Sequence, residues 1–440
     1  MNRRISQRGR DERITPAGPA LGRGVLLEVT QLRCIKCGRT HEPTTDVLTC
    51  SDRACGGLLD VEYDYRSIAR TVDRDALSAS SDRTMWRYGV FLPLGPDSRR
   101  PGLQVGGTPL YRTRHLGRAL GLDDLWVKDE GLNPTASLKD RASAVAVTRA
   151  FEGSFATVAC ASTGNAASSL AGYAASARLR CVIFVPSRAP EGKVAQLLIF
   201  GATVISVEGS YEQTFTLSEK AIEEHGWYNR NAAINPYLIE GKKTVAFELA
   251  EQLGWTVPDW VAVSVGDGCT IAGIYKGFRD LVQVGWLDRI PRLLGVQAEG
   301  CAPVVRALGT GRLEPADEDT LADSIAVGKP RNPDKAIHAV RASHGTMVTV
   351  SDDEIFEAMR LLGRYAGIFG EPAGVTGLAG VRRAFKGGLI ASGERIISIM
   401  TGNGLKDIAS GTRAVAPPAR IPPEYEALEG VLRAAGIGRD

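Results

Sequence analysis

The chain has 440 residues, of which 44% are hydrophobic and 23% are charged, a composition typical of a folded protein with two or three packed units. Its formal net charge of +3 provides no broad positive field, so we do not expect it to bind nucleic acid. No apolar run approaches the roughly 20 residues that span a bilayer, and no apolar signal core follows the first arginines. We therefore expect a cytoplasmic protein without membrane contact.

Two terminal segments differ from the rest of the chain. Residues 1–27 are rich in Arg, Gly and Pro and show no periodicity, which favours a flexible tail. A transit peptide would also be basic, but Asp11 and Glu12 argue against one. Residues 421–440 form a C-terminal segment beyond the main body.

A cluster of cysteines lies within residues 28–66. Its members are Cys34, Cys37, Cys50 and Cys55. The C-x-x-C and C-x4-C spacings would let two turns bring four thiolates to one tetrahedral zinc ion. Because the segment is too short to bury much core, we expect a zinc-ribbon-like appendage held by a larger domain. The alternative is a ribbon of the same shape that has lost its metal.

From about residue 80, short apolar runs alternate with amphipathic stretches. The predicted strands are residues 157–162, 181–186, 203–208, 260–266, 293–299 and 395–402. The predicted helices include residues 243–254 and residues 351–367, the second opened by a Ser351-x-x-Glu354 capping box. Such alternation over more than about 300 residues predicts an α/β protein with a parallel sheet covered on both faces.

Three glycine-bearing turns, at residues 162–169, 265–273 and 401–407, each follow a predicted strand. In an open α/β sheet such turns meet at the carboxyl ends of the strands, so they predict one shared site. In the second turn, Gly266 and Gly268 precede a helix expected to begin at Thr270, whose free N–H groups would face an anion such as phosphate. A plain strand-to-helix turn is the alternative.

Lys139 stands within the sequence NPTASLKDR at residues 133–141. Alone, it would be interpreted as an exposed lysine at the start of a helix. Together with a phosphate-binding turn and polar groups in one crevice, it provides what pyridoxal phosphate requires: an amine for the aldehyde, an anion site, and groups that tune the ring.

NPTASLKDR resembles the N-P-T-G-S-F-K-D-R lysine motif of threonine synthases, which belong to the tryptophan-synthase-β-like, fold type II pyridoxal-phosphate enzymes. STGNA, VGDGCTIAGIYKGF, TGNGLKD and the cysteine ribbon resemble other segments of that family, over roughly residues 28–415. The resemblance implies two doubly wound α/β subdomains with the cofactor between them. It implies a catalytic domain at residues 85–420, with a smaller subdomain inserted at approximately residues 140–245, and a homodimer.

The resemblance also implies residue roles. Lys139 would form the Schiff base with pyridoxal phosphate and act as the acid and base, Asn165 would bind the cofactor O3′, and Thr401 would face the pyridine nitrogen. The substrate carboxylate would bind at the turn made by Ser162, Thr163, Gly164, Asn165 and Ala166. The cofactor phosphate would bind at Gly266, Asp267, Gly268, Cys269 and Thr270. The implied reaction converts O-phospho-L-homoserine and water to L-threonine and phosphate, which requires a second anion site.

Several residues depart from the family pattern. Leu238 stands where we expect an arginine that binds the substrate phosphate, and an alkyl chain cannot bind phosphate. Arg188 and Lys193 are basic residues that would bind this phosphate or serve only as surface charges. Ala136 replaces a usual glycine, and Asp267 brings a negative charge to the expected phosphate turn.

These departures leave two other hypotheses open. One is a sister enzyme that performs β-replacement on a phosphoserine-like substrate, as cysteate synthase does, or an ammonia-lyase reaction. The other is a non-catalytic protein whose ribbon binds nucleic acid or a partner chain, in which case Lys139 and the three turns would be superfluous.

Overall fold

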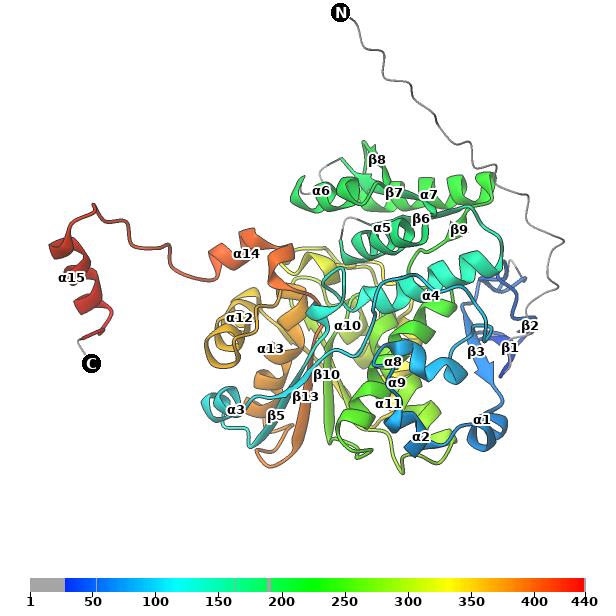
Figure 1. The fold of residues 1–440 in the computed structure, drawn as a ribbon, viewed down its shortest axis with the longest axis horizontal. Coiled ribbons are helices and arrows are strands. Elements are labelled where there is room, and N and C mark those ends of the chain that lie inside the picture. The colour runs from blue at the N-terminus through cyan, green and yellow to red at the C-terminus, as the bar shows by residue number, and fades with distance from the viewer. Residues whose placement is uncertain (1–27, 53, 163, 188–190, 439–440) are drawn as a thin grey trace, which may run out of the picture.

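The computed structural model describes residues 28–438 except residues 53, 163 and 188–190, and the side chains of residues 191–193 are also not described. The tail expected at residues 1–27, Thr163 and Arg188 therefore lie outside the described residues. The described chain forms two mainly parallel β-sheets with associated helices and one small antiparallel sheet (Figure 1).

The larger sheet has six strands in the order β12-β11-β10-β13-β5-β4. Neighbouring strands are parallel, except that β4 runs antiparallel to β5 at one edge. The strands are β4 (Leu110–Arg112), β5 (Asp124–Asp129), β10 (Trp260–Ser264), β11 (Arg292–Ala298), β12 (Thr346–Val350) and β13 (Arg395–Met400). Alternate side chains point to opposite faces. In β10, Val261 and Val263 thus enter one apolar core, and Trp260 and Ala262 enter another.

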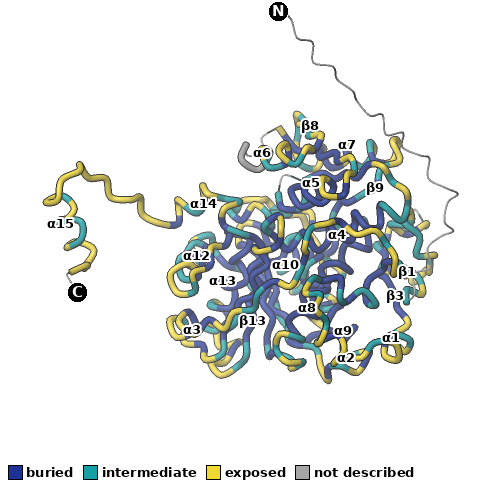
Figure 2. The backbone as a smooth tube through the Cα atoms, in the orientation of Figure 1, coloured by how far each residue is buried: buried dark blue, intermediate teal, exposed yellow. Residues whose placement is uncertain are grey.

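Helices cover both faces of this sheet. The core on the Val261 side includes side chains of α8 (Tyr237–Gln252), α9 (Cys269–Gln283), α10 (Pro303–Thr310) and α11 (Pro333–Ala342). The core on the Trp260 side includes side chains of α3 (Arg114–Leu120), α12 (Asp352–Ala366) and α13 (Pro372–Lys386). Figure 2 shows the central strands as buried and the outer helices as partly exposed. The arrangement confirms the prediction of a mainly parallel sheet covered on both faces.

The smaller sheet has four parallel strands in the order β8-β7-β6-β9 and comes from chain between β5 and β10. Its strands are β6 (Thr157–Ala161), β7 (Arg180–Pro186), β8 (Thr203–Val207) and β9 (Tyr228–Asn229). The associated helices are α4 (Lys139–Glu152), α5 (Asn165–Ala177), α6 (Glu191–Ile199) and α7 (Tyr211–His225). A separate core under α7 contains Phe184, Phe215 and Ile222. The bounds of an inserted subdomain stay a prediction.

All six predicted strands are present, within two residues of the expected ends. The helix predicted from residue 243 begins earlier, at Tyr237, and the capping box of Ser351 and Glu354 is present. Strand β5 was missed, because its last residues, Lys128 and Asp129, are charged and yet buried. Such residues interrupt the apolar pattern by which a buried strand is predicted.

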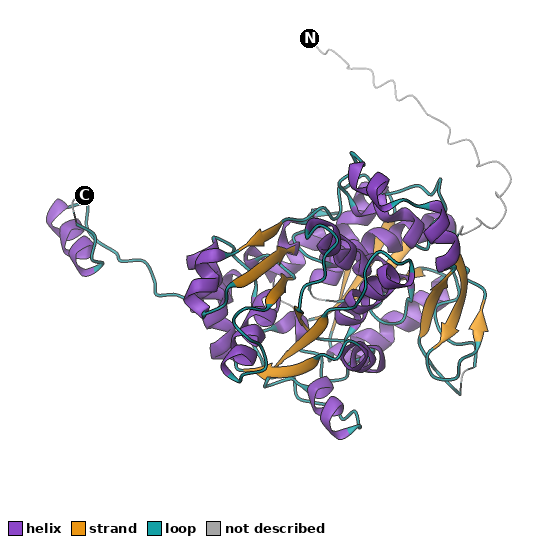
Figure 3. Cartoon of the chain, turned by 90° about the horizontal axis from the view of Figure 1, so that it is seen from below, coloured by secondary structure: helices purple, strands orange, loops and turns teal. Residues whose placement is uncertain are grey.

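The cysteine-rich segment forms a three-stranded antiparallel sheet of β1 (Val29–Cys34), β2 (Thr40–His41) and β3 (Leu59–Tyr63), which lies at one side of the molecule (Figure 3). It contacts the main body through β3. The Tyr63 hydroxyl donates to Glu240 of α8 at 2.7 Å, and the Lys276 ammonium of α9 donates to the Val61 carbonyl at 2.6 Å. The expected appendage is therefore docked on the helices that cover the larger sheet.

The remaining helices connect or extend these units. They are α1 (Tyr65–Thr71), α2 (Arg74–Ala79), α14 (Ile408–Arg413), α15 (Tyr425–Ala434) and the 3-10 turns η1 (Met85–Phe91), η2 (Glu130–Leu132), η3 (Asp323–Ile325) and η4 (Gly404–Lys406). Helix α15 projects away from the main body (Figure 1).

Candidate active site

Lys139 is the first residue of α4, where a short loop meets the helix. Its neighbour Asp140 is fully buried and accepts hydrogen bonds from the Thr135 backbone N–H, at 2.6 Å, and from the Thr135 hydroxyl. Burial raises the pKa of Asp140 to about 6, against the opposing effect of these hydrogen bonds. The Asp140 carboxylate thus joins the loop before Lys139 to the first turn of α4 and fixes the position of Lys139 at the start of that helix.

Arg141, two residues after the lysine, is also fully buried. Its guanidinium forms salt bridges with Glu130 at 2.7 Å and with Glu248 at 2.6 Å, and Glu248 also pairs with Lys128 at 2.7 Å. We call Lys128, Glu130, Arg141 and Glu248 the buried ion network. Because it joins α4 to β5, η2 and α8, it anchors the helix that carries Lys139 to the part of the molecule built around the larger sheet.

The loop before Lys139 is hydrogen-bonded to the turn after β13. The Leu138 N–H donates to the Thr401 carbonyl at 2.9 Å, and the Asn403 N–H donates to the Ala136 carbonyl at 3.1 Å. Ala136 adopts a φ of 66°, a left-handed conformation that costs a residue with a Cβ about 1–2 kcal/mol. The departure from glycine at this position therefore stores strain beside the lysine.

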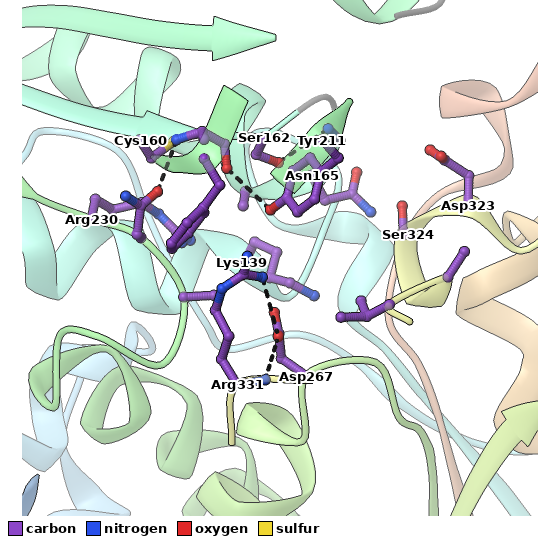
Figure 4. A pocket seen from close by; sticks show the side chains of 18 of the residues that line it. Lys139, Cys160, Ser162, Asn165, Tyr211, Arg230, Asp267, Asp323, Ser324 and Arg331 are labelled. Carbon is purple, nitrogen blue, oxygen red and sulfur yellow. Dashed lines mark hydrogen bonds and ion pairs between the residues drawn. The ribbon is translucent and has the colours of Figure 1, made fainter. Parts of the chain in front are cut away.

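Two adjoining cavities meet at Lys139. The outer cavity has a volume of about 330 Å³ (Figure 4), and the inner cavity a volume of about 60 Å³. Both are lined by Lys139, Asn165, Asp267 and Ser324. The structure thus brings the three predicted turns together: the first lines the outer cavity, and the second and Thr401 of the third line the inner one.

The electrostatic surroundings favour a neutral Lys139 amine. Burial, then the positive charge of Lys242, lowers the pKa of Lys139 to about 8. Arg230 acts in the same direction, whereas Glu371 raises the pKa. A lysine with a lowered pKa has a larger share of the unprotonated form that attacks an aldehyde.

The turn after β6 presents polar groups to the outer cavity. The Ser162 hydroxyl oxygen accepts the Gly164 N–H at 3.2 Å, and Ser162, Gly164 and Ala166 line this cavity. Thr163, predicted to belong to the same turn, lies outside the described residues. Backbone N–H groups at such a turn, next to the N-terminus of α5, are suited to a carboxylate.

Asn165 is the first residue of α5 and is buried. Its amide donates to the buried Glu371 carboxylate at 2.5 Å. A Cβ at position 402 would collide with the Glu371 carboxylate, so a larger residue there would displace the Glu371 side chain from Asn165. Glu371 was not predicted as a site residue, although the segment EPAGV at residues 371–375 precedes the turn that carries Thr401.

The turn from Gly266 to Thr270 lines the inner cavity at the N-terminus of α9. Gly268 has a φ of 92°, and a Cβ on it would lie 2.6 Å from the Asn332 carbonyl oxygen. The first N–H groups of a helix have no intrahelical acceptor, and no side chain caps α9. The helix begins at Cys269, one residue before the prediction, and its N-terminus favours an anion.

Asp267 adds a carboxylate to this turn, but the carboxylate has a partner. It accepts the Arg331 backbone N–H at 3.1 Å and lies 4.0 Å from the Arg331 guanidinium. Its negative charge is therefore partly balanced outside the inner cavity, which removes part of the objection to phosphate at this turn.

Two basic residues predicted near the substrate phosphate cannot be placed by their side chains. Arg188 lies outside the described residues, and only the backbone of Lys193, within α6, is described. Leu238 is 1% exposed and belongs to the core on the Val261 side. The Leu238 side chain lines neither the outer nor the inner cavity.

Sequence reasoning missed three contributors to the cavities. Arg230 lines the outer cavity, Lys242 lines the inner one, and the segment from Glu318 to Arg331 forms one wall. Basic residues at 230 and 242 were visible in the sequence. Their positions at the site follow only from the way α8 and the chain after β9 lie against α4 and α9.

Comparison with known proteins identifies the class. A family described as "Pyridoxal-phosphate dependent enzyme" matches residues 102–402. Diaminopropionate ammonia lyase from Escherichia coli has the same fold, with a TM-score of 0.62 and 20% sequence identity over 77% of this chain and 92% of that chain. None of the described helices is long and apolar enough to cross a membrane.

Relatives in sequence are closer. The chain is 40% identical to the threonine synthase of Methanocaldococcus jannaschii over 405 residues, covering 91% of this chain and 99% of that protein. It is 42% identical to the threonine synthase of Methanosarcina acetivorans, covering 86% of this chain and 92% of that protein. The chain belongs to the pyridoxal-phosphate dependent enzymes and, among them, to the threonine synthase family.

The described residues fit this cofactor. Lys139 offers an amine with a lowered pKa. A Cβ on Gly268 would collide with Asn332 and Ala336, so glycine lets the turn pack closely at the start of α9, where backbone N–H groups can meet an anion. The hydroxyl-bearing Thr401 also lines the inner cavity. These three features lie around one small cavity.

Proposed function

We propose that the enzyme converts O-phospho-L-homoserine and water to L-threonine and inorganic phosphate. The observation that carries this proposal is the 40% identity with a threonine synthase over 99% of that protein's length. The convergence of Lys139 and three polar turns on adjoining cavities supports it. The comparisons offer no support for the β-replacement, ammonia-lyase or non-catalytic hypotheses.

We assign the binding roles as follows. The turn of Ser162, Gly164, Asn165 and Ala166, completed by Thr163, would hold the substrate carboxylate. The turn of Gly266, Asp267, Gly268, Cys269 and Thr270 would hold the cofactor phosphate through backbone N–H groups. Asn165, steadied by Glu371 at 2.5 Å, would orient the cofactor, and Thr401 would face the ring nitrogen. A neutral hydroxyl there leaves that nitrogen largely unprotonated.

When bound, pyridoxal phosphate supplies the electron sink for a carbanion at the substrate Cα. Lys139 would remove the Cα proton and move protons between neighbouring carbons. The Cγ–O bond then breaks, and its electron pair leaves with phosphate. Water supplies the hydroxyl that adds to Cβ and one proton. Cβ loses one proton, Cγ gains one and the released phosphate gains one, so the atoms of substrate and water equal those of threonine and phosphate. The cavity must hold the phosphate away from solvent until this cleavage.

The test is a substrate panel of O-phospho-L-homoserine, O-phosphoserine, L-threonine and L-serine, with phosphate, ammonia and threonine measured as products. We expect equal amounts of phosphate and threonine from the first compound, and none from Lys139→Ala. Release of ammonia alone, or turnover of phosphoserine without turnover of phosphohomoserine, would contradict the proposal.

We also propose that the cysteine cluster binds a structural zinc ion. The four sulfur atoms lie within 4.8 Å of one another, and the Cys34–Cys55 and Cys37–Cys50 separations are 3.6 and 3.7 Å. A tetrahedral zinc with Zn–S bonds of 2.3 Å requires sulfur separations of about 3.8 Å. Metal analysis should give one zinc per chain, lost in Cys37→Ser and kept in the control Cys301→Ser; full-length protein without zinc would contradict the proposal.

A homodimer in the cytoplasm is the assembly we propose. Exposed apolar side chains lie around the turn after β13, where Lys406 of η4 donates to Gln196 of α6 at 3.2 Å: Leu132, Leu198, Ile199, Leu405 and Ile408. None of the described cysteines forms a disulfide, as expected in a reducing compartment. Light scattering should give twice the chain mass, and Ile408→Asp should lower it; a monomeric wild type would rule out the dimer.

A further inference from the structure

Arg230 and Lys242 are buried cations that pair with none of the carboxylates that the structure describes. They are 1% and 2% exposed. The Arg230 Nε donates to the Ser143 hydroxyl at 3.1 Å, but its Nη2 has no hydrogen-bond partner. Among the residues that the structure describes, no carboxylate lies within 4 Å of either side chain. Burial lowers the pKa of both groups, because each charge has lost water without gaining an anion.

Two other cations nearby are paired with described carboxylates. Lys243, adjacent to Lys242 on α8, contacts Glu240 at 2.6 Å and Asp280 at 2.7 Å. Arg331 lines the outer cavity with Arg230, but it contacts Glu212 at 3.2 Å as well as Asp267. An unpaired buried charge is costly, whereas a pair can be tolerated. Arg230 and Lys242 therefore stand out as cations that await a ligand.

Each of the two cations lines a different cavity. Arg230 lines the outer cavity, beside the turn that begins at Ser162. Lys242 lines the inner cavity, beside the turn from Gly266 to Thr270. Lys139 lines both, and its lowered pKa shows that it feels the charge of both cations. Two anions could therefore bind on either side of the reactive lysine.

The reaction proposed above also involves two phosphates, one on the cofactor and one on the substrate. The arginine expected at position 238 would have bound the phosphate of the substrate. Leu238 and Lys242 are one helical turn apart on the same face of α8. Leu238 is buried in apolar surroundings, so a cation there would have to leave the core.

We propose that Arg230 binds the phosphate of the substrate and that Lys242 balances the phosphate of the cofactor. The assignment rests on the proposed function. A planar guanidinium donates two parallel hydrogen bonds to phosphate oxygens, which suits a substrate group that must be oriented before it leaves. A lysine is a point charge, which suits a phosphate already fixed by backbone N–H groups at the start of α9.

The assignment accounts for two departures from the family pattern. Arg230 supplies the guanidinium that Leu238 lacks, from the chain after β9 in place of α8. Lys242 offsets the charge of Asp267, which lines the same inner cavity and contributes to the electrostatics of Lys242. Each cavity thus contains, besides Lys139, one buried cation that pairs with no described carboxylate.

The test compares Arg230→Gln and Lys242→Gln in the full chain, with two probes. The first is inorganic phosphate as an inhibitor competing with O-phospho-L-homoserine, and the second is pyridoxal phosphate titrated into apoprotein. We expect Arg230→Gln to weaken phosphate inhibition and raise KM at least about tenfold, with cofactor affinity within about twofold of wild type. Lys242→Gln should weaken cofactor binding at least about tenfold and leave phosphate inhibition nearly unchanged.

Exposed charges provide matched controls. Arg118→Gln and Lys220→Gln remove the same charges from the surface and should change neither probe. Arg230→Lys should restore part of the phosphate inhibition, and Lys242→Arg should restore cofactor affinity. These conservative variants also serve if a glutamine variant fails to fold, as judged by thermal unfolding.

The outcomes separate this inference from the proposed function. If wild type does not turn over phosphohomoserine, the proposed function fails, while thermal-shift binding of inorganic phosphate still reports on Arg230. Unchanged phosphate binding in Arg230→Gln, or unchanged cofactor affinity in Lys242→Gln, would overturn the assignment. An exchange of the two effects between the variants would overturn it as well.

Discussion

The buried ion network and the two cavity cations place similar residues in opposite circumstances. Arg141 is surrounded by two carboxylates, and Arg230 by none within 4 Å among the described residues. A paired buried charge stabilises a particular packing once it is formed. An unpaired one leaves binding capacity for a ligand. Burial alone therefore does not separate structural from functional cations. The presence or absence of a carboxylate partner within 4 Å does.

Lys139→Ala should give the largest effect and should act on activity alone. We expect activity to fall at least about a thousandfold, because the lysine provides both the covalent anchor and the acid-base group. Its side chain does not belong to the buried ion network, so the free energy of unfolding should not decrease. Steady-state kinetics and urea denaturation check both statements. A stability loss as large as the one expected for Arg141→Gln would show that Lys139 has a structural role like that of the buried ion network.

Arg141→Gln should destabilise the protein by about 3–5 kcal/mol, since it leaves Glu130 and Glu248 buried without their guanidinium partner. Arg230→Gln should cost less than about 1.5 kcal/mol, because it removes one hydrogen bond and no ion pair. Urea-induced unfolding of both variants measures the difference. Equal losses would break the distinction between paired and unpaired cations.

Lys242→Gln should move the pH dependence of cofactor uptake to higher pH. The neutral Lys139 amine reacts, so uptake by apoprotein should rise through a pH of about 8. The Lys242 charge disfavours the protonated Lys139, so removing this charge raises the Lys139 pKa; Arg230 still lowers it, and Glu371 still raises it. Stopped-flow absorbance over a pH series measures the midpoint. A shift to lower pH would contradict this account, and Lys220→Gln serves as the control.

Ala136→Gly should have the smallest effect and tests the strain next to Lys139. The left-handed φ of 66° costs alanine about 1–2 kcal/mol, and glycine loses about 0.5–1 kcal/mol of that gain through its greater freedom in the unfolded chain. We expect a net stabilisation of about 0.5–1 kcal/mol in thermal or urea unfolding. Ala233 also has a positive φ, so Ala233→Gly offers a comparison away from the lysine loop. A loss of stability in Ala136→Gly would show that the backbone there is relaxed.

Much of the fold was accessible from local patterns. The six predicted strands are apolar runs, and all of them except β8 are almost fully buried. The capping box of Ser351 and Glu354 marks the start of α12. Strand β5 escaped prediction because Lys128 is satisfied by Glu248, a residue about 120 positions away. A charged residue in the sequence is interpreted as a surface residue unless its distant partner is known.

The candidate site divides in the same way. Lys139 and the turns at Ser162, Gly266 and Thr401 could be predicted, because their glycines and hydroxyl residues follow strands at fixed places. Arg230 could not, since it lies beyond a two-residue strand without a motif of its own. The sequence showed that position 238 lacks the expected arginine. It did not show which basic residues lie near the substrate phosphate in three dimensions, and Arg188 and Lys193 were proposed from sequence alone.

The sequence by itself determined the cofactor family, the reactive lysine and the strand-turn-helix units, because these depend on residues close together in the chain. Only the tertiary structure decided which charges are paired. Asp267 turns to Arg331, Lys243 turns to Asp280, and Lys242 remains without a described carboxylate within 4 Å. The cost of an unpaired buried charge is a property of its three-dimensional surroundings, and no local pattern in the sequence encodes it.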